Sequence, residues 1–142
     1  MKFSTRTTYG LRAMIRLAEN YEKGSLPLSL IAKEENLSLG YLERIFVRLK
    51  KSKLITSEMG MSGGYKLGNN PDKIEIYDIV KSLEGDLNPF HCVEDRGQIV
   101  CGHKCNCGAT AVLVRVQSAI VKSLKEMNLG ELIKNKTKSK KL

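Results

Sequence analysis

The fold is decided by residues 38–53, which read SLGYLERIFVRLKKSK. Ser38 is a favoured residue at a helix start, because its hydroxyl can accept a hydrogen bond from an amide of the first turn. After it, apolar residues recur at helical spacing, at Leu42, Ile45, Phe46 and Leu49. Five basic residues stand against the single acid Glu43, a local charge of +4. The stretch therefore predicts a helix with one face in a core and another toward an anionic partner, although such charge runs are often only solvated.

The composition of the whole chain points the same way. Its 142 residues are 42% hydrophobic, enough for one domain with an appendage, and its net charge is +9. This charge favours a polyanionic partner, with nucleic acid first and an acidic membrane second. No apolar run approaches the roughly 18 residues of a membrane span, and the N-terminus lacks a secretory signal. A cytoplasmic protein is expected.

Two helices are predicted ahead of residues 38–53, and the second of them is short. The first starts at Thr5 or Thr7 and runs to about Tyr21, and the second spans about 28–35. Asn36 tolerates the left-handed backbone of a tight turn. A short helix, a tight turn and a helix with a basic face form a helix-turn-helix arrangement.

A β-hairpin is predicted directly after this arrangement, with strands at 54–58 and 65–67 and a turn between them. A hairpin in this place is a wing. Gly63 and Gly64 fit two explanations, a turn that needs positive φ or a tip that approaches a sugar-phosphate backbone closely. A further helix is predicted from about Ile74 to Gly85.

A long helix is predicted from Ala109 to about Asn128, with an apolar face at Val112, Val116, Ala119, Ile120, Leu124 and Met127. A helix this apolar needs a partner, either a second copy of the chain or the core of the same chain. One last turn is expected at 129–133, and the basic residues 134–142 are expected to be disordered.

Four cysteines fall within sixteen residues, at Cys92, Cys101, Cys105 and Cys107. Their spacings of eight, three and one residues match zinc knuckles poorly, and an iron–sulfur cluster held by three or four thiolates fits better. Disulfides, zinc and unliganded thiols remain alternatives. The neighbouring His91 and His103 rank low as ligands.

The chain resembles the IscR/NsrR/CymR-type winged-helix transcription regulators over about residues 1–133. The resemblance is carried by residues 3–5 and 9–14, by Leu37-Ser38-Leu39-Gly40-Tyr41-Leu42-Glu43, by the wing at 63–67, by the cysteine loop and by 129–132. It implies a bacterial homodimeric regulator of mainly α fold, with a small β-hairpin wing and a long dimerisation helix. The expected division is a DNA-binding domain at 1–84, a cluster-binding loop at 85–108, a dimerisation helix and terminal turn at 109–133, and a basic tail at 134–142.

The resemblance also implies cluster ligands. Family members that bind a cluster carry three loop cysteines, which correspond to Cys92, Cys101 and Cys107, while Cys105 is a further candidate ligand. A [2Fe–2S] cluster is favoured and a [4Fe–4S] cluster is the alternative. The fourth ligand stays open among Cys105, His103, a residue of the partner's first helix and a small molecule.

The expected function is binding of double-stranded DNA at a palindromic operator, with repression favoured, under control of iron–sulfur supply, redox state or nitric oxide. Base edges would meet Ser38, Gly40, Tyr41, Glu43 and Arg44, and phosphates would meet Arg48, Lys50, Lys51, Gly63 and Gly64. The alternative is a thiol-redox or cysteine-metabolism regulator of the same fold without a cluster. Catalysis is not expected, since the chain shows no nucleophile–base pair and no phosphate-cradling loop.

Overall fold

Three helices build the N-terminal half of the molecule: α1 (Thr5–Glu19), α2 (Leu28–Glu35) and α3 (Leu39–Lys51). They are seen in a computed structural model that describes residues 2–88, 90, 92, 98 and 107–139. α2 has the predicted bounds, and α3 is the helix predicted from residues 38–53. α1 begins before Thr7 and ends two residues short of Tyr21, where a 3-10 turn η1 (Tyr21–Lys23) follows.

α3 is held in the core by its apolar stripe. The four predicted core residues are completely buried: Leu42, Ile45, Phe46 and Leu49. Ser38 occupies the N-cap position as predicted, but its side chain makes no capping hydrogen bond, so the predicted bond is wrong. The helix start therefore depends on burial of the stripe rather than on the hydroxyl, because tertiary packing supplies most of a short helix's stability.

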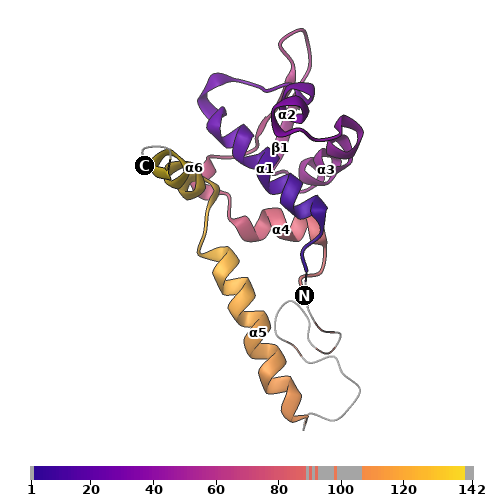
Figure 1. The fold of residues 1–142 in the computed structure, drawn as a ribbon, viewed down its shortest axis with the longest axis vertical. Coiled ribbons are helices and arrows are strands. Elements are labelled where there is room, and N and C mark those ends of the chain that lie inside the picture. The colour runs from indigo at the N-terminus through magenta and orange to yellow at the C-terminus, as the bar shows by residue number, and fades with distance from the viewer. Residues whose placement is uncertain (1, 89, 91, 93–97, 99–106, 140–142) are drawn as a thin grey trace.

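The turn between α2 and α3 confirms the role expected for Asn36. Its backbone is left-handed, with φ 53° and ψ 50°. The amide of Leu37 donates to the carbonyl oxygen of Ala32 at 2.8 Å, which satisfies a carbonyl at the end of α2. The helix-turn-helix arrangement is thus present in the structure, as Figure 1 shows.

The wing is a two-stranded antiparallel sheet of β1 (Ile55–Glu58) and β2 (Gly64–Leu67). Positive φ in its turn belongs to Gly60, at 114°, so the positive-φ explanation of Gly63 and Gly64 is wrong. Both glycines instead allow close approach within the protein. A Cβ on Gly63 would lie 2.6 Å from the carbonyl oxygen of Glu58, and one on Gly64 would lie 2.4 Å from that of Leu26.

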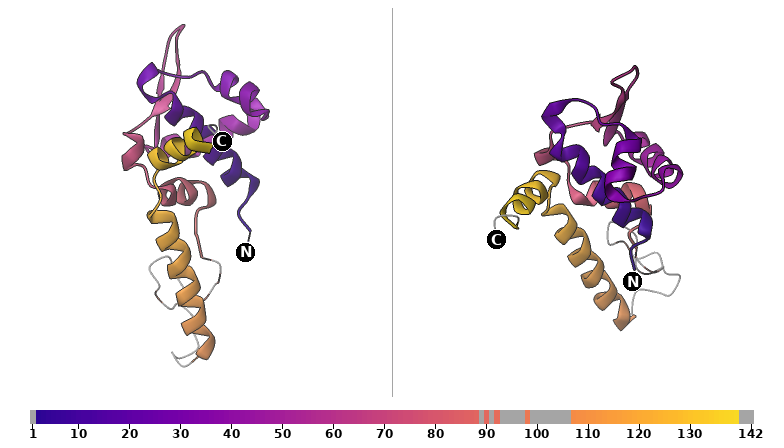
Figure 2. Two further views of the ribbon diagram at one scale, coloured as in Figure 1. Left: turned by 60° about the vertical axis from the view of Figure 1, so that its left-hand side comes forward. Right: turned by 45° about the horizontal axis from the view of Figure 1, so that its top comes forward.

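After the wing, a 3-10 turn η2 (Pro71–Lys73) leads to α4 (Ile76–Glu84), which ends at Gly85 with φ 86°. α4 packs against α1 and α3 and covers the side of the core that is the lower one in Figure 1. α5 (Gly108–Lys125) then extends away from this body as a rod, which Figure 2 shows in two further views.

The apolar stripe predicted for α5 is divided between two environments. Leu124 is buried in the core and Ile120 packs against it, whereas Val112 and Val116 are 61% and 39% exposed. The end of α5 nearer the body therefore joins the winged core, and the far end presents apolar side chains to solvent. One part of the stripe therefore packs on the core of the same chain, and the other part is available to a second copy of the chain.

The chain returns to the body through α6 (Leu129–Ser139). Leu129 is fully buried, and its amide donates to the carbonyl oxygen of Ile74 at 2.9 Å. Because the helix runs to Ser139, the boundary expected at residue 134 is placed too early, and disorder is the wrong expectation for residues 134–139. Lys134 and Lys136 explain the extension, since they reach Asp72 and Glu19 at 3.2 and 2.7 Å.

Within the described residues, no helix combines the length and the apolar character that a membrane span requires.

Candidate nucleic-acid interface and cysteine segment

The face of α3 opposite its buried stripe carries most of the predicted contact residues on one exposed surface. Seven of them are exposed: Ser38, Gly40, Glu43, Arg44, Arg48, Lys50 and Lys51. Tyr41 differs, since it is half-buried and its ring meets that of Tyr9 edge to face, with centroids 5.8 Å apart. Tyr41 therefore has a packing role between α3 and α1 in addition to any outward contact.

Val47 is a candidate contact residue that the sequence analysis missed. Its side chain is 68% exposed although it is apolar. It follows Arg44 by three positions and Glu43 by four, so all three lie on one side of the helix. This spacing can be read from the sequence, so it could have identified Val47 as a contact residue. An apolar side chain on such a face suits the methyl group of thymine in the major groove.

The position of α3 relative to the wing is fixed by two contacts. The ring of Phe46 packs against that of Tyr65 on β2, with centroids 4.8 Å apart. The ammonium of Lys50 donates to the hydroxyl of Ser57 on β1 at 2.6 Å. These contacts join the end of the helix to the sheet, so the helix and the wing present one continuous surface.

Ion pairs between α1 and α2 hold the other half of the helix-turn-helix. Arg12 Nε lies 2.9 Å from Glu35 Oε2, and Arg12 Nη2 donates to the carbonyl oxygen of Glu35 at 2.7 Å. Arg16 pairs with Glu34 and with Glu19, and these carboxylates raise its pKa. Because α2 is short, these charged hydrogen bonds at its C-terminal end help to keep it in place.

Two of the four cysteines lie in the described part of the chain. Cys92 is half-buried and Cys107 is exposed, and both are free thiols. Cys107 occupies the N-cap position of α5. Cys101, Cys105, His91 and His103 lie outside the described residues. Among the residues that are described, no three potential ligands are grouped around a metal position.

The cysteine segment is the stretch between α4 and α5 that contains the four cysteines. Both of its ends are attached to α5. Cys107 directly precedes the helix, and at the other end the amide nitrogen of Gln117 donates to Asn88 Oδ1 at 2.6 Å. Gln117 is only 2% exposed, so this hydrogen bond is largely shielded from water. No sequence signal predicts this pair, because the segment has no periodicity.

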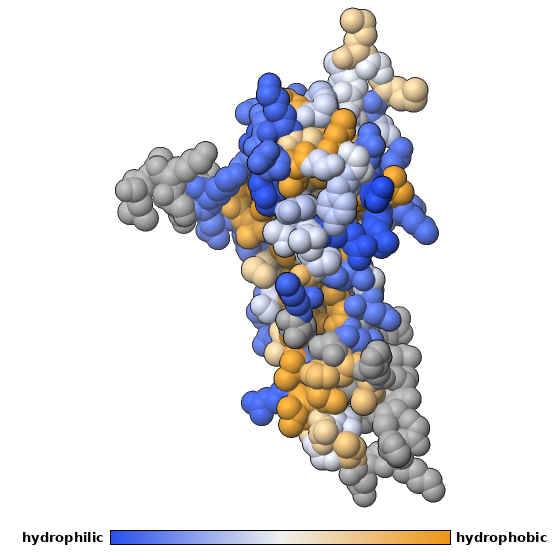
Figure 3. Space-filling view, turned by 45° about the vertical axis from the view of Figure 1, so that its right-hand side comes forward, coloured by the Kyte–Doolittle hydropathy of each residue, from blue (hydrophilic) through white to orange (hydrophobic). Residues whose placement is uncertain are grey.

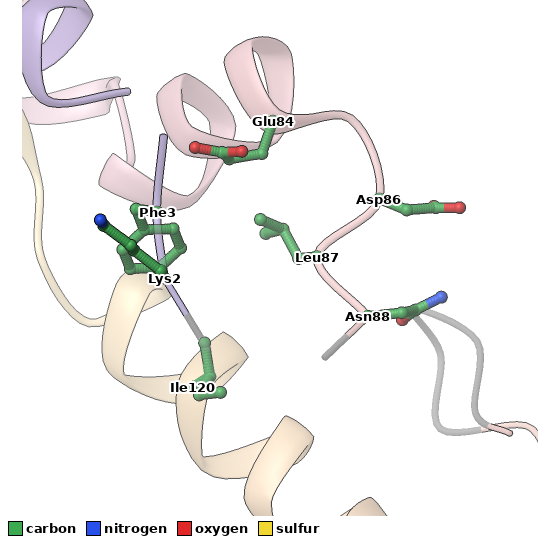
Figure 4. A pocket seen from close by; sticks show the side chains of 7 residues that line it. All are labelled: Lys2, Phe3, Glu84, Asp86, Leu87, Asn88 and Ile120. Carbon is green, nitrogen blue, oxygen red and sulfur yellow. The ribbon is translucent and has the colours of Figure 1, made fainter. Parts of the chain in front are cut away.

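A pocket of about 110 Å³ lies where the cysteine segment begins, and Figure 4 shows it between the N-terminal residues, the end of α4 and α5. Leu87 extends into it toward Phe3 and Ile120. Glu84 at its edge accepts hydrogen bonds from the amide and hydroxyl of Ser4, both at 2.7 Å, and from the hydroxyl of Thr7. Partial burial raises the pKa of Glu84, but the hydrogen bonds from Thr7 and Ser4 outweigh it and hold the pKa below its ordinary value.

Comparison with known proteins places this geometry in a family. The chain is 43% identical over 95 residues to the HTH-type transcriptional regulator CymR of Bacillus subtilis, covering 67% of this chain and 69% of that protein. It is 32% identical over 136 residues to the HTH-type transcriptional regulator IscR of Escherichia coli, covering 95% and 82%. The structure of B. subtilis CymR, described as the global cysteine regulator, superimposes with a TM-score of 0.79 at 32% identity over 95% of this chain and 98% of that chain.

The Rrf2 family model, described as an iron-dependent transcriptional regulator, matches residues 3–135. The matched range includes the helix-turn-helix, the wing, the cysteine segment, α5 and most of α6. The resemblance inferred from the sequence is thus confirmed, and the relatives are regulators rather than enzymes. The chain belongs to the Rrf2 family of transcriptional regulators.

Proposed function

We propose that two copies of this chain bind a palindromic operator in double-stranded DNA, with repression as the expected outcome. The observation that carries the proposal is the exposed basic face of α3, held rigidly by its buried stripe. Each α3 would enter a major groove, where Arg44 can donate to guanine and Glu43 can accept from the amino group of cytosine. Arg48, Lys50 and Lys51 would hold phosphates, and Ser38, Gly40, Tyr41, Gly63 and Gly64 would border the DNA.

The far end of α5 supports the dimer. Val112 and Val116 are exposed there, and Figure 3 shows an apolar surface over the lower part of the molecule. Exposed apolar patches on soluble proteins commonly mark protein contacts. A second α5 packed along this surface would cover the valines and set the distance between the two α3 helices.

We further propose that Cys92, Cys101 and Cys107 hold an iron–sulfur cluster, with Cys105 as a further candidate ligand. The donor set fits, because thiolates are the usual protein ligands of such clusters and both described thiols are free. The cluster would supply a redox-active, oxygen-sensitive group. Since Cys107 and Asn88 attach the segment to α5 at both ends, order in the segment would bear on the direction of α5 and hence on the spacing of the DNA-binding faces.

The expected change in DNA affinity on binding the cluster can be bounded. Coupling between two linked sites is typically about 1–3 kcal/mol, or roughly 5–150-fold in affinity. The test is to purify the protein without oxygen and to titrate a duplex recovered by selection from a randomised pool, with cluster-loaded and cluster-free protein. We expect affinities that differ within that range.

Single Cys→Ala variants at positions 92, 101, 105 and 107 complete the experiment. Replacement of Cys92, Cys101 or Cys107 is expected to remove the absorption of the anaerobic protein and to give the affinity of the cluster-free form. Equal affinities of loaded and cluster-free protein would remove the sensing role while leaving DNA binding intact.

A second candidate is a thiol-redox or cysteine-metabolism regulator without a cluster. The 43% identity to CymR favours it. In this case the anaerobic protein would be colourless, and the cysteines would form reversible disulfides that alkylation and mass spectrometry detect. A brown protein with four alkylatable thiols after cluster removal would contradict this alternative.

A further inference from the structure

The methionines of the chain differ sharply in their access to dissolved reagents. Met59 and Met61, at the tip of the wing, are 99% and 110% exposed. Met14 is fully buried in the core, and Met127 is partly buried against it. Figure 3 shows the end of the wing projecting beyond the rest of the molecule. An oxidant in solution therefore reaches the two thioethers of the wing before it reaches either of the others.

The wing beneath this tip is anchored, so the two methionines stay outside the fold. The amide of Leu26 donates to the carbonyl oxygen of Tyr65 at 2.8 Å, and the amide of Tyr65 donates back to Leu26 at 2.9 Å. The hydroxyl of Ser25 donates to the carbonyl oxygen of Ser62 at 2.7 Å. Chemical change at the tip would thus leave these bonds and the core beneath them in place.

The chemistry open to an exposed thioether is oxidation to a sulfoxide, for which hydrogen peroxide is a sufficient oxidant. A lone pair of the sulfur forms a bond to one peroxide oxygen while the O–O bond breaks. The hydroxide that leaves takes the proton of the transferred hydroxyl group and becomes water. Sulfur loses two electrons, and the peroxide gains them. Methionine sulfoxide reductases reverse the step, with one enzyme for each epimer of the sulfoxide.

A sulfoxide would change the character of this tip, which is otherwise uncharged. No ionisable side chain occurs from Met59 to Gly64, and Glu58 and Lys66 just below pair with each other. The sulfoxide oxygen accepts hydrogen bonds but has no proton to donate. Phosphate oxygens and most base edges in the minor groove are acceptors as well. A sulfoxide held beside duplex DNA would therefore lose hydration without gaining a partner, which is unfavourable.

We propose that Met59 and Met61 form an oxidant-sensitive site, at which reversible conversion to sulfoxides by a peroxide weakens DNA binding. The proposal rests on the proposed function, since it takes the wing to border the duplex. The site is separate from the cysteine chemistry, because Figure 1 shows the wing and the start of α5, where Cys107 lies, at opposite ends of the molecule. The two chemistries also have different repair: thiols reduce disulfides, and sulfoxide reductases restore methionine.

The experiment treats the full chain, free of cluster, with graded hydrogen peroxide and then with dithiothreitol, which reverses disulfides. Peptide mass spectrometry locates the added oxygen. We expect Met59 and Met61 to gain one oxygen atom each before Met127 and Met14 do. Affinity for the duplex recovered by selection from a randomised pool should then be about tenfold weaker, the effect of one acceptor left without a partner. Incubation with both sulfoxide reductases should restore it.

The matched control is the double variant Met59→Leu, Met61→Leu, which keeps apolar side chains of similar size but cannot form a sulfoxide. The comparison is made within each protein, between treated and untreated samples. After peroxide and dithiothreitol, the variant should keep the affinity of its untreated form, because its cysteines have been reduced and its remaining described methionines are sheltered. Thermal unfolding checks that both proteins stay folded throughout.

Three results would overturn the inference: oxidation of Met127 or Met14 ahead of the wing, sulfoxides at the wing with unchanged DNA affinity, or an equal loss of affinity in the leucine variant. If the untreated protein preferred no duplex over random sequence, the proposed function would fail, and the inference would fail with it. Selective binding of the duplex that is indifferent to sulfoxides at the wing would remove only the inference.

Discussion

Glu84 shows how a single side chain connects distant parts of the chain. Its Oε1 accepts hydrogen bonds from Ser4 and Thr7, about eighty positions earlier in the sequence. Ser4 is the N-cap of α1, but its side chain makes no capping hydrogen bond to the helix. The carboxylate at the end of α4 therefore fixes the N-terminus of α1, next to the start of the cysteine segment.

The replacement Glu84→Gln should reduce the stability of the protein at neutral pH. A carboxyl group whose pKa is lower in the folded state stabilises the fold above its ordinary pKa near 4.5 and loses that contribution as the pH falls through the lowered value. Hydrogen bonds to a charged group are worth about 1.5–3 kcal/mol, and partial exposure reduces this to about 1 kcal/mol. Urea unfolding of both proteins at pH 7 and in steps below pH 5 should show a difference that narrows as the pH falls. A difference that stays constant with pH would contradict this assignment.

At the scale of elements, the wing depends on its contact with the segment between α1 and α2. Leu26 and Tyr65 exchange backbone hydrogen bonds, which gives β2 a second neighbour besides β1. Gly64 makes this possible, because any side chain there would meet the backbone of Leu26. The orientation of the wing is thus set by a segment that lies nearly forty residues earlier.

The replacement Gly64→Ala should disturb this contact. The added methyl group would lie 2.4 Å from a backbone oxygen that cannot rotate away, and overpacking of this kind costs about 1–3 kcal/mol. Gly108→Ala is the matched control, because its Cβ meets nothing within 4 Å. It should change the stability little, since Gly108 is the first residue of α5 and the cost of glycine applies to the interior of a helix. Chemical unfolding of the two variants measures both effects, and Gly64→Ala should also weaken DNA binding. If Gly64→Ala were as stable as the unmodified protein, the backbone around Gly64 and Leu26 would be able to shift without a cost in free energy, and the prediction would be wrong.

At the scale of the whole molecule, α5 divides its apolar stripe between the body and the solvent. Leu124 belongs to the core, while Val112 and Val116 are exposed. The same helix adjoins the cysteine segment at Cys107 and at the Gln117–Asn88 hydrogen bond. Under the proposed function, a change in that segment would reach the element that joins the two subunits.

The double replacement Val112→Asp, Val116→Asp should convert the proposed dimer into monomers. Both side chains are exposed in the single chain, so the monomer should remain folded, while charges buried in a dimer contact are strongly unfavourable. Sedimentation equilibrium measures the change, and DNA affinity should fall by at least tenfold. The control is Ala111→Asp, Ser118→Asp, on another exposed side of the same helix, which should leave the dimer intact. A double valine variant that still sediments as a dimer would place the contact elsewhere.

The sequence by itself determined the local elements and the family. The apolar spacing in residues 38–53, the bounds of α2, the turn at Asn36 and the wing are all encoded within short windows, since helical and strand periodicity is a local property. The exposed basic face of α3 follows directly from its buried stripe, because residues that are not in the stripe must point outward. The family resemblance drew on the same short motifs.

Only the tertiary structure decided the contacts between distant positions. It assigned Gly64 to the Leu26 backbone, Glu84 to the start of α1, and Lys134 and Lys136 to a helix that packs on the body, where the sequence suggested a disordered tail. It also divided the α5 stripe between core and solvent. The physical reason is that steric exclusion, charge pairing and burial depend on which surfaces meet, and a periodic pattern shows that a residue needs a partner without showing which one it has.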